Sequence, residues 1–115
     1  MTSWAIVRFE EVGFHRYPDA PGEVTYLQER HRHKFFVEVW VQQFHDNRDL
    51  EYHILRDMVI KLFREIAPLN EFDAMSCEMI ASDLRDKVMN WYKGRRCKVT
   101  VFEDNENGGR VDDDD

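Results

Sequence analysis

Two kinds of hydrophobic spacing divide this chain into strands and helices. Residues 4–14 and 31–42 are rich in β-branched and aromatic side chains, and residues 97–103 alternate apolar with polar positions. These patterns are typical of strands. A loop at residues 16–22 contains two prolines and a glycine, which break regular structure. After it we expect a short strand at residues 24–27.

The spacing changes to a helical one in the middle of the chain. Residues 50–66 predict an amphipathic helix, with Asp49 as its N-cap and Pro68 beyond its end. A second helix is expected to start at Ser76 and to stop at Gly94. The predicted inner side chains are Leu50, Ile54, Leu55, Met58, Val59, Leu62, Phe63 and Ile66 in the first helix, and Met79, Ile80, Leu84, Val88, Met89 and Tyr92 in the second.

The order of these elements predicts the fold class. Residues 69–75 serve as a connector, and a turn at 105–109 leaves room for a short strand near Arg110. The order is strand, strand, helix, helix, strand, which an α+β fold satisfies with an antiparallel sheet covered on one face by two helices. Residues 1–111 form one domain, and the four acids at 112–115 are expected to be a disordered tail.

Composition restricts the function. At 115 residues with a net charge of −7, the chain has no basic excess that would favour a nucleic-acid partner. We expect no membrane span and no signal peptide, because no apolar run is long enough. Two cysteines give no disulfide framework, so we expect a cytoplasmic protein. Cys77 falls in the first turn of a helix, which lowers some thiol pKa values, although a buried small residue fits equally.

Three histidines are candidate metal ligands. His31 and His33 lie on the same face of their strand, roughly 6.5–7 Å apart. His15 closes the first strand, and antiparallel pairing would bring the three imidazoles together. Three histidines with an open fourth position are typical of a catalytic zinc site, and such a site weakens as pH falls below about 6.5. The same pattern also fits two exposed histidines on an edge strand and one in a loop.

Five segments carry a resemblance to a known family. They are Phe14-His15-Arg16, His31-Arg32-His33, residues 48–56, Met75-Ser76-Cys77-Glu78-Met79-Ile80-Ala81 and residues 99–104. In this order they resemble the 6-pyruvoyl-tetrahydropterin synthase and 6-carboxy-tetrahydropterin synthase family, which has the tunnelling fold. The resemblance implies that His15, His31 and His33 bind Zn²⁺. It also implies that Glu103 and Ser76 bind a pterin, and that the chain forms a homo-oligomeric ring, a trimer or hexamer.

The chain departs from the family pattern where the family places its proton-transfer groups. Leu27 stands where the synthases have a cysteine base, and Glu65-Ile66 stands where they have Asp-His. Glu29, two residues before His31, is our candidate replacement base. Ser76 can equally be an N-cap with only a local role.

Three functions remain open from the sequence. The first is a zinc-dependent carbon–oxygen lyase that acts on dihydroneopterin triphosphate or a related pterin. The second is a non-catalytic zinc protein that binds a pterin- or purine-like ligand. The third is an oligomeric scaffold without a ligand.

Overall fold

The structure is a computed structural model that describes residues 1–112, so residues 113–115 of the expected acidic tail lie outside the described part. None of the helices in that part is both long and apolar enough to cross a membrane. The elements, in chain order, are β1 (Ser3–His15), the 3-10 helix η1 (Gly22–Leu27), β2 (His31–Gln43), α1 (Tyr52–Arg64), the 3-10 helix η2 (Pro68–Asn70), β3 (Glu71–Asp73), α2 (Cys77–Trp91), β4 (Cys97–Glu103) and β5 (Asn107–Val111).

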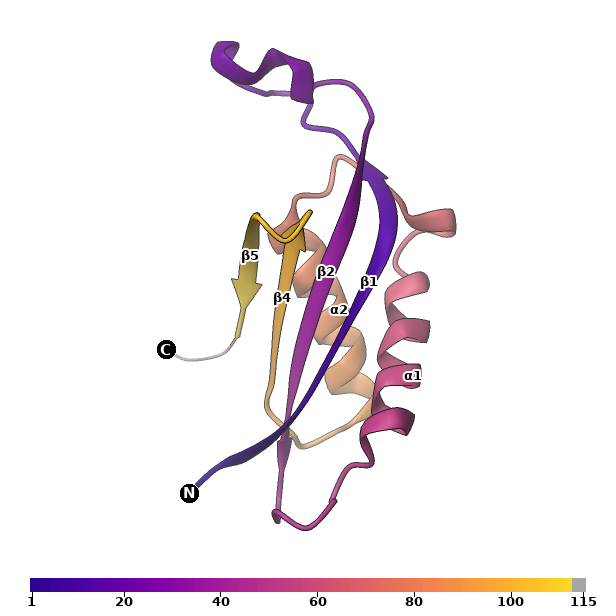
Figure 1. Ribbon diagram of the computed structural model, residues 1–115, viewed down its shortest axis with the longest axis vertical. Helices are drawn as coiled ribbons and strands as arrows, with labels where there is room; N and C mark the ends of the chain where they lie inside the picture. The colour runs from indigo at the N-terminus through magenta and orange to yellow at the C-terminus, as the bar shows by residue number, and fades with distance from the viewer. Residues whose placement is uncertain (113–115) are drawn as a thin grey trace.

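The strands form one sheet in the order β3-β1-β2-β4-β5 (Figure 1). The pairs β1–β2, β2–β4 and β4–β5 are antiparallel. Along most of β1 and β2 every second residue is buried, and the buried apolar side chains join those of α1 and α2 in one core. The helices therefore cover one face of the sheet, which confirms the α+β class.

The pairing of β1 with β2 is continuous over thirteen residue pairs, from Ser3↔Gln43 to His15↔His31. Apolar inner positions such as Val7 and Val39 face each other, and both are buried. Because side chains alternate along a strand, a slip of one residue would move this whole set to the other face. The apolar pattern therefore fixes where the histidines lie at the far end of the sheet.

An aromatic cluster lies at that end of the core. Phe35, Phe63 and Phe72 are buried, and the Phe72 ring makes edge contacts with the Phe35 and Phe63 rings, each at 5.5 Å between centroids. Gly13 provides the space, since a Cβ there would lie 2.8 Å from the Phe72 ring and 2.9 Å from the Phe35 ring.

Two stretches differ from the sequence predictions. Residues 24–27 belong to the 3-10 helix η1 and form no strand. η1 has no buried residue, so nothing pairs this apolar stretch with the sheet. The expected connector at 69–75 contains β3, whose Phe72 is buried. β3 pairs parallel to β1, so the sheet has five strands and is not wholly antiparallel.

Some predicted boundaries and faces were also wrong. The N-cap of α1 is Glu51, whose carboxylate accepts the N–H groups of His53 and Ile54. The Asp49 carboxylate instead accepts a hydrogen bond from Arg95. α2 ends at Trp91, before Gly94, and β5 already begins at Asn107 within the expected turn. Two predicted inner side chains, Ile54 and Met79, are exposed.

The outer edge of β1 is covered by side chains along part of its length. In the described part of the chain, β3 pairs only with Phe14 and His15 at the end of this edge. Farther along the edge, Arg56 Nε donates to the Arg8 carbonyl at 2.9 Å, and Asn70 Nδ2 donates to the Val12 carbonyl at 3.0 Å. These two carbonyl groups, which an unpaired strand edge would leave without partners, are thereby hydrogen-bonded.

We expect Phe72→Ala to lower the free energy of unfolding by about 3–5 kcal/mol, the usual cost of deleting a large buried aromatic side chain. Leu69→Ala is the control, because Leu69 is 92% exposed three residues earlier and should change stability by less than about 0.5 kcal/mol. Urea unfolding followed by circular dichroism measures both. Equal stabilities for the two variants would contradict the packing role of Phe72.

Asp49 should make the free energy of unfolding depend on pH in the acid range. Arg95, 2.7 Å away, and the Phe44 N–H lower the pKa of Asp49 from 3.8 to about 2. The folded state therefore releases this proton more readily than the unfolded chain. The stabilisation is complete above about pH 4 and is lost as pH falls through 2. Urea unfolding should show Asp49→Asn less stable than the parent at pH 7, with the gap closing near pH 2. Asp46→Asn, an exposed neighbour, should show no such gap.

Candidate metal centre

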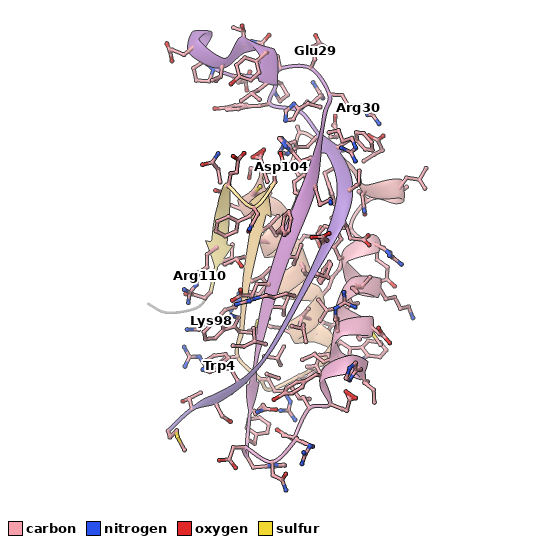
Figure 2. The ribbon with its side chains drawn as sticks, in the orientation of Figure 1. Trp4, Glu29, Arg30, Lys98, Asp104 and Arg110 are labelled. Atoms are coloured by element: carbon pink, nitrogen blue, oxygen red, sulfur yellow. The ribbon has the colours of Figure 1, made fainter. Side chains whose placement is uncertain are left out.

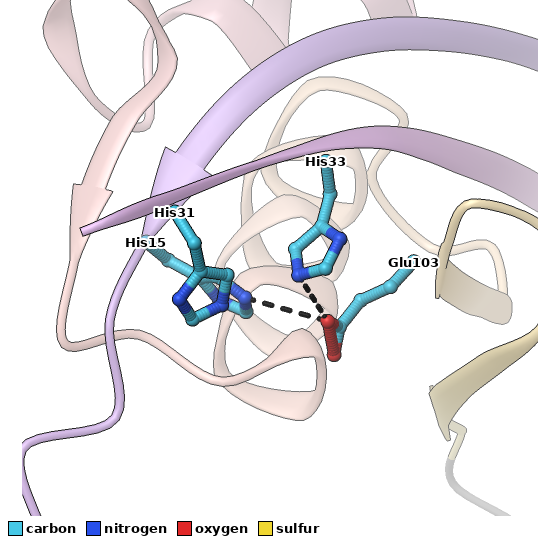
Figure 3. Close-up of side chains that lie close together, drawn as sticks. All are labelled: His15, His31, His33 and Glu103. Carbon is cyan, nitrogen blue, oxygen red and sulfur yellow. Dashed lines mark ion pairs between the residues drawn. The ribbon is translucent and has the colours of Figure 1, made fainter. Parts of the chain in front are cut away.

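Three histidines lie together where β1 ends and β2 begins (Figure 3). His15 and His31 are direct cross-strand partners, and His33 follows two residues later on the same face. The ring centroids are 4.6 Å apart for His15 and His31, 5.1 Å for His15 and His33, and 4.8 Å for His31 and His33. The antiparallel pairing expected from the sequence brings all three together.

Each imidazole is oriented by an oxygen on its Nδ1 side. His15 Nδ1 lies 2.9 Å from the Met75 carbonyl, His31 Nδ1 lies 2.9 Å from the Glu29 carbonyl, and His33 Nδ1 lies 2.7 Å from a carboxylate oxygen of Asp104. Carbonyl and carboxylate oxygens only accept, so Nδ1 carries the proton in each ring. The Nε2 lone pairs are then free, as in histidines that bind metals.

Glu103 adds a carboxylate to the three imidazoles. Its Oε2 lies 2.6 Å from His33 Nε2 and 3.5 Å from His15 Nε2. His33 Nε2 is nevertheless the one buried side-chain nitrogen or oxygen in residues 1–112 that has no hydrogen-bond partner. Two acceptor atoms that face each other at this distance repel unless a proton or a metal cation lies between them. This is the strongest sign that the cluster binds a metal ion.

A tight turn brings Glu103 to the histidines. Glu103 is the last residue of β4, and Asp104 and Asn105 adopt left-handed backbone conformations with φ of 52° and 59°. The Glu106 N–H closes the turn on the Glu103 carbonyl at 2.9 Å. Two consecutive acids thus reach opposite nitrogens of one ring, since Glu103 faces His33 Nε2 and Asp104 holds His33 Nδ1. The sequence analysis missed Asp104 because this contact spans 71 residues.

The surroundings of the site shift the pKa values of His15 and Asp104. Burial lowers the pKa of His15, against the opposing effects of the Met75 carbonyl and Glu103. The Lys34 N–H, together with His33, lowers the pKa of Asp104. At neutral pH His15 is therefore ready to bind a metal, and Asp104 is a carboxylate.

A cavity of about 530 Å³ adjoins the cluster. Its wall includes His15, His31 and Glu103, so the candidate ligands face a space that can hold a small molecule. The other lining residues are Arg16, Tyr17, Leu27, Ala74, Met75, Ser76, Cys77, Glu78, Met79, Asn107 and Gly108. The apolar members give surface for a flat ring, and the polar members can fix its orientation.

Two further predicted site residues have structural contacts. The Ser76 hydroxyl caps α2 by accepting the Met79 N–H at 3.1 Å, and Ser76 also lines the cavity. Glu29 is exposed on the loop between β1 and β2, which extends beyond the end of the sheet (Figure 2). It contributes its carbonyl to His31, and it is not among the residues that line the cavity. Its role as a base stays a prediction.

Cys77 lies in the first turn of α2 and is buried. Burial, with Glu103 and Glu78 nearby, raises the pKa of its thiol to about 12, so the helix position does not activate it. Cys97 is buried on β4.

The donor set fits a metal ion. One ligand atom from each of His15, His31, His33 and Glu103 lies within 4.8 Å of the others. Tetrahedral ligands with bonds of about 2.0–2.1 Å are about 3.3 Å apart, a value between the shortest and longest separations here. Three imidazoles and a carboxylate suit several divalent transition metals.

Neither protein-family models nor curated proteins give a match to this chain. Among solved structures, the fold is similar to that of an uncharacterized protein, WS1659, from Wolinella succinogenes. The identity is 13%, the TM-score is 0.70, and the match covers 99% of each chain. At this identity the likeness shows a shared fold and carries no function.

We expect Asp104→Asn to weaken zinc binding by about 10–100-fold, the usual effect of removing an oxygen that orients a ligand histidine. The asparagine has one acceptor oxygen for two donors, the Lys34 N–H and His33 Nδ1. Competition with a chromophoric chelator measures the affinity. Glu106→Gln, an exposed change in the same turn, is the control and should leave the affinity unchanged. Parental affinity in Asp104→Asn would show that Asp104 does not support the centre.

Proposed function

We propose that the chain is a zinc-dependent carbon–oxygen lyase of the 6-pyruvoyl- and 6-carboxy-tetrahydropterin synthase type, with a tunnelling fold. Its substrate is dihydroneopterin triphosphate or a related pterin. The observation that carries the proposal is the convergence of His15, His31 and His33 beside a cavity whose wall includes His15 and His31. The sequence resemblance supplies the substrate class and the metal.

The residues of the cluster would hold Zn²⁺. His15, His31 and His33 supply neutral imidazoles, and Asp104 keeps His33 in the required tautomer. Zinc, when bound, acts as a Lewis acid on the hydroxyl or carbonyl oxygens of the pterin side chain. Glu103 is placed so that its carboxylate reaches both this cluster and the cavity.

The cavity residues would bind the pterin ring. Tyr17, Leu27 and Met75 present apolar surface to the flat ring. A carboxylate pairs well with a ring edge that carries two N–H donors, which is the role proposed for Glu103. Ser76 lines the same wall and can contact the ligand with its hydroxyl while that oxygen caps α2.

Proton transfer requires a base, and Glu29 is the proposed one. Its loop is joined to the cluster through its carbonyl on His31, so a movement of the loop would be needed to bring its carboxylate to the cavity. In this proposal the chain acts in the cytoplasm as a homo-oligomer, a trimer or hexamer.

A second candidate is a non-catalytic zinc protein that binds a pterin- or purine-like ligand. The position of Glu103 favours it, because a fourth protein ligand closes the open coordination position that catalytic zinc sites keep. The exposure of Glu29 favours it as well. The two candidates share the metal and the cavity and differ in turnover.

Elemental analysis and turnover assays test the proposal together. We expect about one zinc per chain in the purified protein, and its loss in a His31→Ala variant. With dihydroneopterin triphosphate, inorganic triphosphate should be released by the parent protein. Glu29→Gln should slow this by about 10²–10⁴-fold, the usual contribution of a general base, whereas Glu23→Gln, an exposed change in η1, should not.

The outcomes separate the candidates. Protein without stoichiometric zinc contradicts both. Zinc-loaded protein that binds the pterin without releasing triphosphate supports the binding protein. Full turnover in Glu29→Gln removes Glu29 as the base and leaves the lyase standing.

A further inference from the structure

The loop that joins β1 to β2 is held together by its own contacts. The Tyr17 N–H donates to the Leu27 carbonyl at 2.8 Å, so the two ends of the segment 17–27 lie side by side. The Ala20 N–H donates to the Tyr17 carbonyl at 3.1 Å, and Gln28 Nε2 donates to the Ala20 carbonyl at 3.4 Å. Ala20 is buried. These are the features of a compact surface loop that packs on itself, so residues 17–29 (the 17–29 loop) form one unit.

Two acids on β3 hold the ends of this loop. At one end, Arg16 donates its backbone N–H to the Asp73 carbonyl at 2.7 Å and its Nε to Asp73 Oδ1 at 2.6 Å. At the other end, Arg30 Nε lies 3.1 and 2.9 Å from the two carboxylate oxygens of Glu71, and Arg30 Nη2 donates to the same carboxylate. Glu71 and Asp73 flank the buried Phe72. β3 therefore holds both ends of the loop while its middle side chain packs in the core.

The two ends are attached in different ways. The Arg16 end has a backbone hydrogen bond, which persists whatever side chain residue 73 carries. The Arg30 end depends on side chains, because its guanidinium binds Glu71 and lies over the Phe14 ring, 3.8 Å from the ring centroid. A bidentate arginine–carboxylate pair above an aromatic ring is stronger than most surface ion pairs. The Arg30–Glu71 pair is therefore the main side-chain attachment at its end of the loop.

Other contacts of the loop with the rest of the protein are few. Within residues 1–112, the one hydrogen bond that leaves the 17–29 loop is that between the Glu29 carbonyl and His31 Nδ1. The 3-10 helix η1, which makes up the middle of the loop, has no buried residue. Loss of the Arg30–Glu71 pair would therefore leave little to hold the loop in one position.

The position of the loop matters for the cavity beside the candidate metal centre. Tyr17 and Leu27 line that cavity. Glu29, the proposed base, is exposed and directly precedes Arg30 where the loop joins β2 (Figure 2). A shift of the loop would displace one part of the cavity wall and move Glu29, while the pairing of β1 with β2 keeps the histidines in place.

We propose that Arg30 and Glu71 are positioning residues whose ion pair holds the 17–29 loop in place and thereby controls the access of a small molecule to the cavity. When the pair opens, the loop pivots on its Arg16 end. The inference rests on the proposed function for the identity of the small molecule. The position of the loop itself can be measured without any ligand.

A distance between two spin labels tests whether the pair positions the loop. One label is attached at Tyr26→Cys, in η1, where the tyrosine is 72% exposed, and the other at Ser82→Cys, on an exposed position of α2. The native Cys77 and Cys97 are buried. We expect one narrow distance distribution in the labelled parent protein. Glu71→Gln should give a broad one, because the loop is then released at one end.

Three further variants assign the effect to the ion pair. Asp73→Asn is the matched control and should keep the narrow distribution, because the backbone bond to Arg16 remains and asparagine tolerates the left-handed backbone there, with φ of 54°. Arg30→Gln should broaden the distribution. Arg30→Gln/Glu71→Gln should broaden it no further than Arg30→Gln alone, because both changes remove the same pair. Circular dichroism confirms that each variant is folded.

The kinetics of ligand binding supply a readout that a purely structural role would not change. Neopterin, followed by its fluorescence in stopped flow, is the probe. In Glu71→Gln its association and dissociation rates should both rise by about 3–10-fold, because the loop leaves its closed position more often. The equilibrium affinity should change less than either rate.

The outcomes separate this inference from the proposed function. A narrow, parental distance distribution in Glu71→Gln would overturn the inference. Equal broadening in Asp73→Asn and Glu71→Gln would also overturn it, because the Arg30 end would then have no special role. Broadening in Glu71→Gln alone, in a protein that binds no neopterin, would support the positioning role and contradict the pterin site.

Discussion

The register between β1 and β2 is the constraint on which the candidate site depends. Thirteen consecutive residue pairs place His15 opposite His31, and His33 follows on the same face. The register is fixed by buried apolar residues such as Val7 and Val39, far from the histidines. The same contacts that stabilise the core thus bring the imidazoles together, and the site needs no separate folding energy to align these two strands.

Much of this arrangement could be predicted because it depends on short-range patterns in the sequence. Two-residue spacing places His31 and His33 on one face, and two adjacent strands with a single connecting loop usually pair antiparallel. The three histidines of these strands were therefore predicted correctly as neighbours. Glu103 was recognised as a functional candidate, but its place beside His33 depends on β4 pairing with β2, which local pattern does not specify.

The errors have related physical causes. Residues 24–27 have the composition of a strand, yet they lie in a protruding loop with no strand beside them, so propensity had no tertiary support. β3 was missed because three residues carry no measurable period, and its single buried side chain, Phe72, is defined only by packing on Phe35 and Phe63. Asp49 has a good N-cap side chain, but Arg95, 46 residues away in sequence, holds it instead.

The covered edge of β1 has a consequence for how copies of this chain can meet. Arg56 and Asn70 donate hydrogen bonds to backbone carbonyls at the β1 edge of the sheet, whereas β5 forms the opposite edge. A chain that added a strand beside β1 would first have to displace these two side chains, so growth of the sheet is easier in one direction than in the other. Edge-to-edge growth of the sheet into fibres is disfavoured by this asymmetry, because each new copy must open the covered β1 edge before the next can join.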